Sequence, residues 1–236
     1  MRFEITFYLE KRGIPMDYRS GLLSFFKKAL ENYDKDIFQM IYGVGQKKDI
    51  TFSPFILCEQ ITKTEIHLKN NILKVFYSVE DQLLGLHIFN SFLNIREQIY
   101  PFFNNKITLL KIIKLKEKEI KEETVFFKIM SPVIIREQIS PKKSWYYLLD
   151  NNGVDILKKN LIYSLKNKFP EKYLDQLEIV PLDIKKTITS FYGIKMMGSL
   201  GIVKVKGKKE ILNYLYKSGI STSRKSSGFG MVDILD

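Results

Sequence analysis

A short segment near the C-terminus combines two cations, two serines and two glycines. Its residues are Arg224, Lys225, Ser226, Ser227, Gly228, Phe229 and Gly230. Glycines let backbone amides approach phosphate oxygens closely, a nearby cation adds charge, and serine hydroxyls donate hydrogen bonds. We therefore predict that this segment holds a phosphodiester backbone. The competing interpretation is a glycine-rich turn that only closes the fold.

Histidine and cysteine are too sparse for several familiar kinds of site. The chain has two histidines, His67 and His87, and one cysteine, Cys58. His67 lies on a predicted hairpin and His87 on an apolar helix, where a structural role is the more common one. A zinc site needs several such ligands close together, and no Walker loop or dinucleotide fingerprint is present. The sequence thus predicts no metal and no cofactor, and a single cysteine favours a reducing, cytoplasmic setting.

The charge balance predicts an anionic partner. The formal net charge is +12, and between Lys185 and Lys225 there are ten basic residues and one acid, Glu210. Basic domains of this kind commonly bind nucleic acid, although a chain can also be rich in lysine without such a role. No stretch reaches the roughly 18 unbroken apolar residues of a membrane helix, so no membrane partner is predicted.

The elements that must position these residues follow a similar order twice. In the first half, hydrophobic periodicity predicts strands at 2–10, 50–61, 64–68, 72–79 and 106–115, with 64–68 and 72–79 as a hairpin. It predicts helices at 19–33, 37–42 and 81–93. In the second half it predicts strands at 125–130, 177–189, 194–206 and 231–235, and helices at 154–168 and 208–218. Each half has the order β-α-β-β-α-β, so the predicted fold class is α+β with two tandem ferredoxin-like domains, 1–120 and 121–236.

Three stretches together resemble a known family. Gly198-x-x-Gly201 before a basic strand, then Gly219-Ile220 and Ser227-Gly-Phe-Gly-Met-Val-Asp233, resemble the C-terminal signature of the CRISPR-associated repeat-processing endoribonucleases, which belong to the repeat-associated mysterious protein superfamily. Two further stretches, Lys48-Asp-Ile-Thr-Phe-Ser-Pro54 and Ile129-Met-Ser-Pro-Val133, resemble the family's Thr-Phe-Ser strand and Ser-Pro turn. They lie in the family's order, so the resemblance spans nearly the whole chain.

The resemblance implies an endoribonuclease that binds the repeat RNA of a CRISPR transcript and cuts it once without a metal. The ribose 2′-hydroxyl attacks the adjacent phosphate and leaves a 2′,3′-cyclic phosphate and a 5′-hydroxyl. One group must deprotonate the nucleophile, another must protonate the leaving oxygen, and a third must stabilise the developing charge. In many members a histidine after the first helix transfers a proton, and a lysine before the Thr-Phe-Ser strand steadies the phosphate.

This sequence departs from the family at the histidine. Counting back from Thr51, the histidine position falls at or near Tyr42, the lysine on Lys48, and a first-helix polar position near Lys27 or Lys28. The predicted catalytic residues are therefore Tyr42, Lys48 and Lys27. Because tyrosine has a reference pKa of about 10 and is a poor base near neutral pH, an RNA-binding protein of the same fold with weak or no cleavage stays open as the alternative.

Further cations are predicted to hold the RNA. They are Lys47, Arg136, Lys142, Lys143, Lys204 and Lys206. The residues after Lys143 include Trp145-Tyr146-Tyr147, whose rings suit base stacking, or alternatively belong to the core. The predicted partners are precursor CRISPR RNA, a CRISPR effector complex and, in a homodimer, a second copy of the chain.

Overall fold

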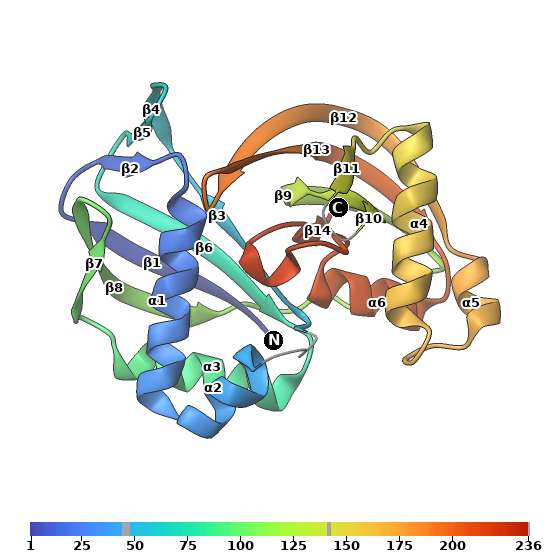
Figure 1. Ribbon diagram of the computed structural model, residues 1–236. Coiled ribbons are helices and arrows are strands. Elements are labelled where there is room, and N and C mark those ends of the chain that lie inside the picture. Colours follow the sequence, from blue (N-terminus) through green and yellow to red (C-terminus); the bar gives the residue numbers. More distant parts are fainter. Residues whose placement is uncertain (44–47, 141–142, 236) are drawn as a thin grey trace.

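The chain forms an α+β structure with several antiparallel sheets (Figure 1). A computed structural model describes residues 1–43, 48–140 and 143–235. Across these three ranges, none of the helices combines the length and the apolar character that crossing a membrane requires.

The first half of the chain builds a five-stranded sheet covered by helices. Its elements are β1 (Arg2–Leu9), β2 (Gly13–Pro15), α1 (Tyr18–Tyr33), α2 (Lys35–Tyr42), β3 (Ile50–Phe55), β4 (Cys58–Ile61), β5 (Glu65–Leu68), β6 (Ile72–Val79), α3 (Gln82–Asn94), β7 (Ile99–Phe102) and β8 (Asn105–Lys114). The large sheet has the order β3-β6-β1-β8-β7. Asp81 accepts a hydrogen bond from the Leu84 amide and begins α3, as the sequence predicts.

The second half repeats this arrangement of central strands. Its elements are β9 (Thr124–Val133), β10 (Ile135–Ser140), β11 (Lys143–Tyr147), α4 (Asn151–Leu165), α5 (Glu171–Asp175), β12 (Glu178–Phe191), β13 (Ile194–Lys206), α6 (Lys209–Ser218), the 3₁₀ turn η1 (Lys225–Ser227) and β14 (Val232–Ile234). The sheet order is β12-β13-β9-β14. In the first half β1 therefore lies between β6 and β8, with β3 at an edge. In the second half β9 lies in the same way between β13 and β14, with β12 at an edge.

One predicted pairing is wrong. The strands at 64–68 and 72–79 exist, but they do not form a hairpin with each other. β5 pairs with β2 and β4 in a small separate sheet, whereas β6 lies between β1 and β3. The short turn between the two strands suggested a hairpin, but the long-range partners determine which sheet each strand joins.

Each half has its own hydrophobic core, and a smaller cluster lies between them. The main cores form around residues such as Phe7 and Phe52 in the first half and Phe127 and Leu157 in the second. The cluster between them includes Leu23 from α1 and Phe229. Figure 1 shows the C-terminal segment (red) lying between the two halves.

The Thr-Phe-Ser motif joins the halves through side chains on β3. The Thr51 hydroxyl donates to the Phe229 carbonyl at 3.1 Å, and the Ser53 hydroxyl donates to the Met130 carbonyl at 2.6 Å. Phe52, between them, is fully buried in the first core. The motif thus places a core residue between two hydroxyl groups, and both hydroxyl groups donate hydrogen bonds to the second half.

Candidate functional site

The glycine-rich segment packs directly against the first half. Gly228 and Gly230 have φ values of +86° and +75°, a region that glycine adopts without strain. A Cβ on Gly228 would lie 2.5 Å from the Phe52 ring, and one on Gly230 would overlap Ser221. These two glycines are therefore required by the turn and by its close contact with neighbouring residues.

The backbone of this segment is already hydrogen-bonded inside the protein. The amides of Gly228 and Gly230 donate to the carbonyls of Lys225 and Pro132, at 3.1 and 2.9 Å. Phe229 is fully buried, and its amide donates to the Lys225 carbonyl at 3.4 Å. The expectation that these three residues offer amides to phosphate is thus corrected, because the amides of Gly228 and Phe229 donate within the turn and that of Gly230 donates to Pro132.

Arg19 on α1 anchors the same turn from the first half. It is buried, its Nε donates to the Gly228 carbonyl at 3.3 Å, and its Nη1 donates to Thr189 Oγ1 at 3.1 Å. Its guanidinium also lies 5.0 Å from the centre of the Phe229 ring. This arginine therefore holds the turn in place.

Lys27, Tyr42 and Lys48 come together, as predicted. Lys27 extends from α1, Tyr42 is the last residue of α2, and Lys48 lies two residues before β3. The ammonium nitrogens of Lys27 and Lys48 lie 5.1 and 4.8 Å from the centre of the Tyr42 ring. Burial and the neighbouring charge of Lys27 both lower the pKa of Lys48.

The Tyr42 hydroxyl hydrogen-bonds inside the first core, against which its ring packs. It shares a hydrogen bond with the buried Tyr77, and its ring packs 5.5 Å from that of Phe38. Burial raises the pKa of Tyr42 far above its usual value, and the bond with Tyr77 offsets this only in part. Tyr42 thus presents the face of its ring to the two lysines, and its hydroxyl is poorly placed to exchange a proton with a ligand.

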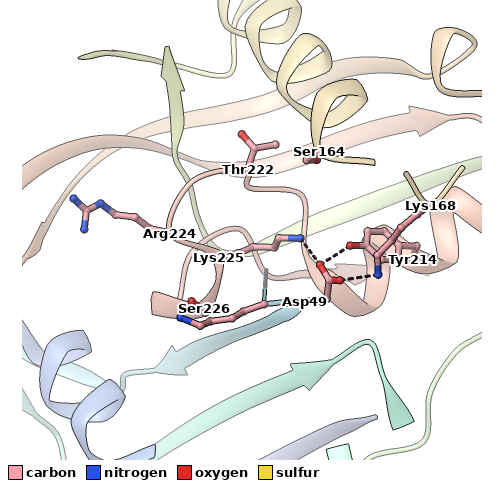
Figure 2. Close-up of a pocket in the computed structure, with 9 residues that line it drawn as sticks. Asp49, Ser164, Lys168, Tyr214, Thr222, Arg224, Lys225 and Ser226 are labelled. Carbon is pink, nitrogen blue, oxygen red and sulfur yellow. Dashed lines mark hydrogen bonds and ion pairs between the residues drawn. The ribbon is translucent and has the colours of Figure 1, made fainter. Parts of the chain in front are cut away.

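A cavity of about 280 Å³ opens beside Lys48, between the two halves (Figure 2). Its lining is strongly cationic and includes hydroxyl groups. The residues are Lys48, Asp49, Ser164, Lys168, Tyr214, Thr222, Arg224, Lys225 and Ser226. Such a set of cations and donors suits a phosphate group.

Asp49 lies at the wall of this cavity and contacts three residues of the second half. Its carboxylate accepts from the Tyr214 hydroxyl at 2.5 Å, from Lys168 Nζ at 2.8 Å and from Lys225 Nζ at 3.4 Å (Figure 2). Burial alone would raise the pKa of Asp49, but Lys225, Lys168 and Tyr214 together hold it below its usual value. Asp49 is therefore ionised at neutral pH.

The C-terminal half of the chain matches a known protein family. The family described as CRISPR associated protein Cas6, C-terminal, matches residues 115–234, just over half of the chain. The chain belongs to the Cas6 family. No curated protein matches it in sequence.

Solved structures of Cas6 proteins share the fold over the whole chain. A Cas6-related protein from Pyrococcus furiosus has a TM-score of 0.86 at 23% identity, covering 100% of this chain and 98% of that one. A structure described as an RAMP protein binding different RNA substrates has a TM-score of 0.85 at 20% identity, covering 100% of both chains. A Cas6 product complex has a TM-score of 0.72 at 13% identity, also covering 100% of both.

Four other predicted RNA-binding residues of this Cas6 protein are not among the residues that line the cavity. Arg136 and Lys143 are on the β10–β11 hairpin, where Lys143 lies over the ring of the half-exposed Trp145. Lys204 and Lys206 are on β13, and Lys206 pairs with Glu178 at 3.5 Å. Two further candidates, Lys47 and Lys142, fall outside the described residues.

The two histidines are also outside the cavity lining. His67 lies on β5, 3.7 Å from Glu65, and its pairing partners belong to the small sheet. His87 lies on α3 with its ring near that of Tyr33. Neither histidine is among the residues that line the cavity, and the structural role that the sequence favours for both stays a prediction.

Sequence reasoning missed the residues that complete the site from the second half. Lys168 and Tyr214 belong to segments that read as an ordinary lysine-rich helix end and an amphipathic helix. One signal was present for Asp49, since it is an acid placed directly between the candidate Lys48 and a buried strand. Its partners could be found only once the two halves were placed together.

Proposed function

We propose that this chain is a metal-independent endoribonuclease that binds and cleaves CRISPR repeat RNA. The observation that carries the proposal is the meeting of Lys27 and Lys48 over Tyr42, beside a cationic cavity between the two halves. Membership of the Cas6 family and the described RNA-binding and product-complex relatives support it. The proposed ligand is precursor CRISPR RNA; an effector complex and a second copy of the chain are further proposed partners.

In the proposed reaction, the 2′-hydroxyl oxygen forms a bond to phosphorus while the bond to the 5′-oxygen breaks. The proton leaves the 2′-hydroxyl, and the 5′-oxygen gains one, which gives a 2′,3′-cyclic phosphate and a 5′-hydroxyl. Lys48, whose pKa is lowered, is assigned both proton transfers, because the Tyr42 hydroxyl is buried. Its neutral amine accepts the proton of the 2′-hydroxyl, and the ammonium group so formed donates a proton to the 5′-oxygen. Lys27 is assigned stabilisation of charge on the phosphate.

The RNA backbone is proposed to enter the cavity along the cationic residues that line it from the second half. Arg224, Lys225 and Ser226 line the cavity, and Ser227 adjoins them in the same turn. A phosphate there would meet cations and hydroxyls together, which strengthens each hydrogen bond. The more distant Arg136, Lys143, Lys204 and Lys206 are proposed to contact RNA outside the cleavage site.

The finer description of the fold is part of this proposal. We assign each half to the ferredoxin-like type, with domains at 1–120 and 121–236. The shared strand order of the two sheets and their separate cores support the assignment.

A second candidate function is RNA binding without efficient cleavage. The observation that favours it is the inward direction of the Tyr42 hydroxyl, which leaves lysines as the nearest titratable groups. Losing an efficient proton-transfer group typically costs about 10²–10⁴-fold in rate. Tight and salt-sensitive binding with no product would select this alternative.

The deciding experiment incubates the purified protein with its cognate repeat RNA in excess EDTA. The expected result is one cut with a 2′,3′-cyclic phosphate end. A matched RNA carrying a single 2′-deoxynucleotide at the cut site should bind equally and stay intact, since it lacks the nucleophile. Cleavage of that deoxy substrate at the same place would contradict the proposed mechanism.

A further inference from the structure

Lys48 and Asp49 are neighbours in the chain but contact different halves of the molecule. The Lys48 ammonium group lies over Tyr42, next to Lys27. The Asp49 carboxylate binds Lys168, Tyr214 and Lys225, which all belong to the second half. This dipeptide therefore links the candidate catalytic lysines to residues 224–230, which form a basic turn.

The second half presents its own pair of lysines over a tyrosine ring. Lys168 Nζ and Lys225 Nζ lie 4.8 and 5.6 Å from the centre of the Tyr214 ring. Asp49 accepts hydrogen bonds from all three side chains (Figure 2). Their arrangement around the carboxylate is thus fixed at several points.

The main chain of Asp49 is fixed as well. Its carbonyl accepts from the Glu80 amide at 3.0 Å, at the end of β6, and the next residue, Ile50, begins the buried strand β3. The side chain therefore extends from a rigid base. A carboxylate held in this way can set where its partners lie relative to Lys48.

The lining of the cavity needs such a counter-charge. Lys48, Lys168, Arg224 and Lys225 carry four positive charges, and Asp49 is the one acid among the described lining residues. Like charges this close repel one another, and more strongly away from bulk water. Burial lowers the pKa of Lys225, whereas Asp49 favours its charged form.

We propose that Asp49 is a positioning residue for RNA cleavage. Its carboxylate holds Lys168 and Lys225 at a fixed distance from Lys48, so that a phosphate bound by the second half meets the Lys27–Lys48 pair. This inference rests on the proposed endoribonuclease function. It adds a specific role for a residue that does not itself touch the reacting atoms.

The test compares Asp49→Asn with wild type under single-turnover conditions at saturating repeat RNA. The rate should fall by about 10- to 100-fold, since small misplacements of reacting groups have costs of this order. The Kd for uncleavable 2′-deoxy RNA should stay within about threefold, because the cations remain. Asp49→Glu, which keeps the carboxylate, should recover part of the rate.

Two further variants separate positioning from stability. Tyr214→Phe removes one hydroxyl from the Asp49 cluster, which is Asp49 with its partners Lys168, Tyr214 and Lys225, and should lower the cleavage rate by about 3- to 10-fold. This variant tests the inference if Asp49→Asn does not fold. Glu123→Gln is the matched control, since Glu123 accepts from Lys208 at 2.6 Å and does not line the cavity. It should cleave like wild type.

The outcomes distinguish this inference from the proposed function. If wild type binds repeat RNA and never cuts it, the endoribonuclease proposal fails and the inference falls with it. If wild type cuts and both Asp49→Asn and Tyr214→Phe cut equally fast, the inference alone is overturned. A loss confined to Kd, or one that Glu123→Gln reproduces, also overturns it.

Discussion

Tyr42 and Tyr214 lie in different halves of the chain, yet each carries two lysine ammonium groups over its ring. Lys27 and Lys48 lie over Tyr42, and Lys168 and Lys225 lie over Tyr214. The negative face of an aromatic ring attracts a cation, so each ring can hold two cations that would otherwise repel each other. The two tyrosines thus hold two pairs of lysines, and three of these four lysines, Lys48, Lys168 and Lys225, line the cavity between the halves.

The lysines over Tyr42 should be essential for cleavage. Lys48→Met and Lys27→Met each remove a charge while keeping an apolar side chain, and each should lower the single-turnover rate by about 10²–10⁴-fold. Lys28→Met is the matched control, because Lys28 adjoins Lys27 on α1 but pairs with the exposed Glu31 at 3.0 Å. Denaturing gels of end-labelled repeat RNA give the rates; a large loss in Lys28→Met would show that the wrong lysine has been assigned.

The ring of Tyr42 should matter more than its hydroxyl. Tyr42→Phe should cleave within about threefold of wild type and lose about 1–3 kcal/mol of unfolding free energy, because Tyr77 loses its buried partner. Tyr42→Ala also removes the platform for the lysines and should lose cleavage together with about 3–5 kcal/mol. Rates and urea unfolding curves measure both effects. Abolished cleavage in a stable Tyr42→Phe protein would return the hydroxyl to the mechanism.

The pH dependence of cleavage should report the pKa of Lys48. Burial and the charge of Lys27 lower this pKa, so the neutral amine is available at a lower pH than in an ordinary lysine. Lys27→Met removes one of these causes. The rising limb of its residual pH–rate profile should therefore move to higher pH, only in part because burial remains. A profile that keeps its midpoint would argue against proton transfer by Lys48.

The glycines of the basic turn should be required for folding. Gly230→Ala combines a left-handed φ, which costs about 1–2 kcal/mol, with overlap on Ser221, which adds about 1–3 kcal/mol. Gly193→Ala is the matched control, since Gly193 has a similar φ of +73° and nothing within 4 Å of the added Cβ. Thermal unfolding should rank Gly230→Ala well below Gly193→Ala. Equal losses would mean that the turn adjusts to the added methyl group.

The sequence predicted elements and local chemistry better than long-range partners. Periodicity located the long strands and helices of both halves, and the Asp81 cap was visible in the sequence. The hairpin of β5 and β6 was wrong because pairing depends on strands far away in the chain. The proximity of Lys27, Tyr42 and Lys48 could be predicted because their positions were assigned from the family resemblance. Residues that share a site in a family lie close together in space.

Contacts between the halves were outside the reach of sequence reasoning. Asp49 and Lys225 are separated by 176 positions, and no local pattern links them. The amides of the glycine-rich turn were predicted to approach phosphate, whereas in the folded chain those of Gly228 and Phe229 donate within the turn and that of Gly230 donates to Pro132. The direction of the Tyr42 hydroxyl depends on Tyr77 in β6, which gives no signal at the sequence level.

The Asp49 cluster should also make stability depend on acid. The pKa of Asp49 is lower in the folded protein than its usual value of 3.8, so its contribution is present above that pH and is lost as pH falls through the folded pKa. Because Asn cannot ionise, Asp49→Asn should be less stable than wild type by about 1.5–3 kcal/mol near pH 7, as for hydrogen bonds to charged groups. Urea unfolding at a series of pH values should show this difference shrinking below about pH 4. A constant difference down to pH 2 would mean that the charge on Asp49 is not what stabilises the contact between the halves.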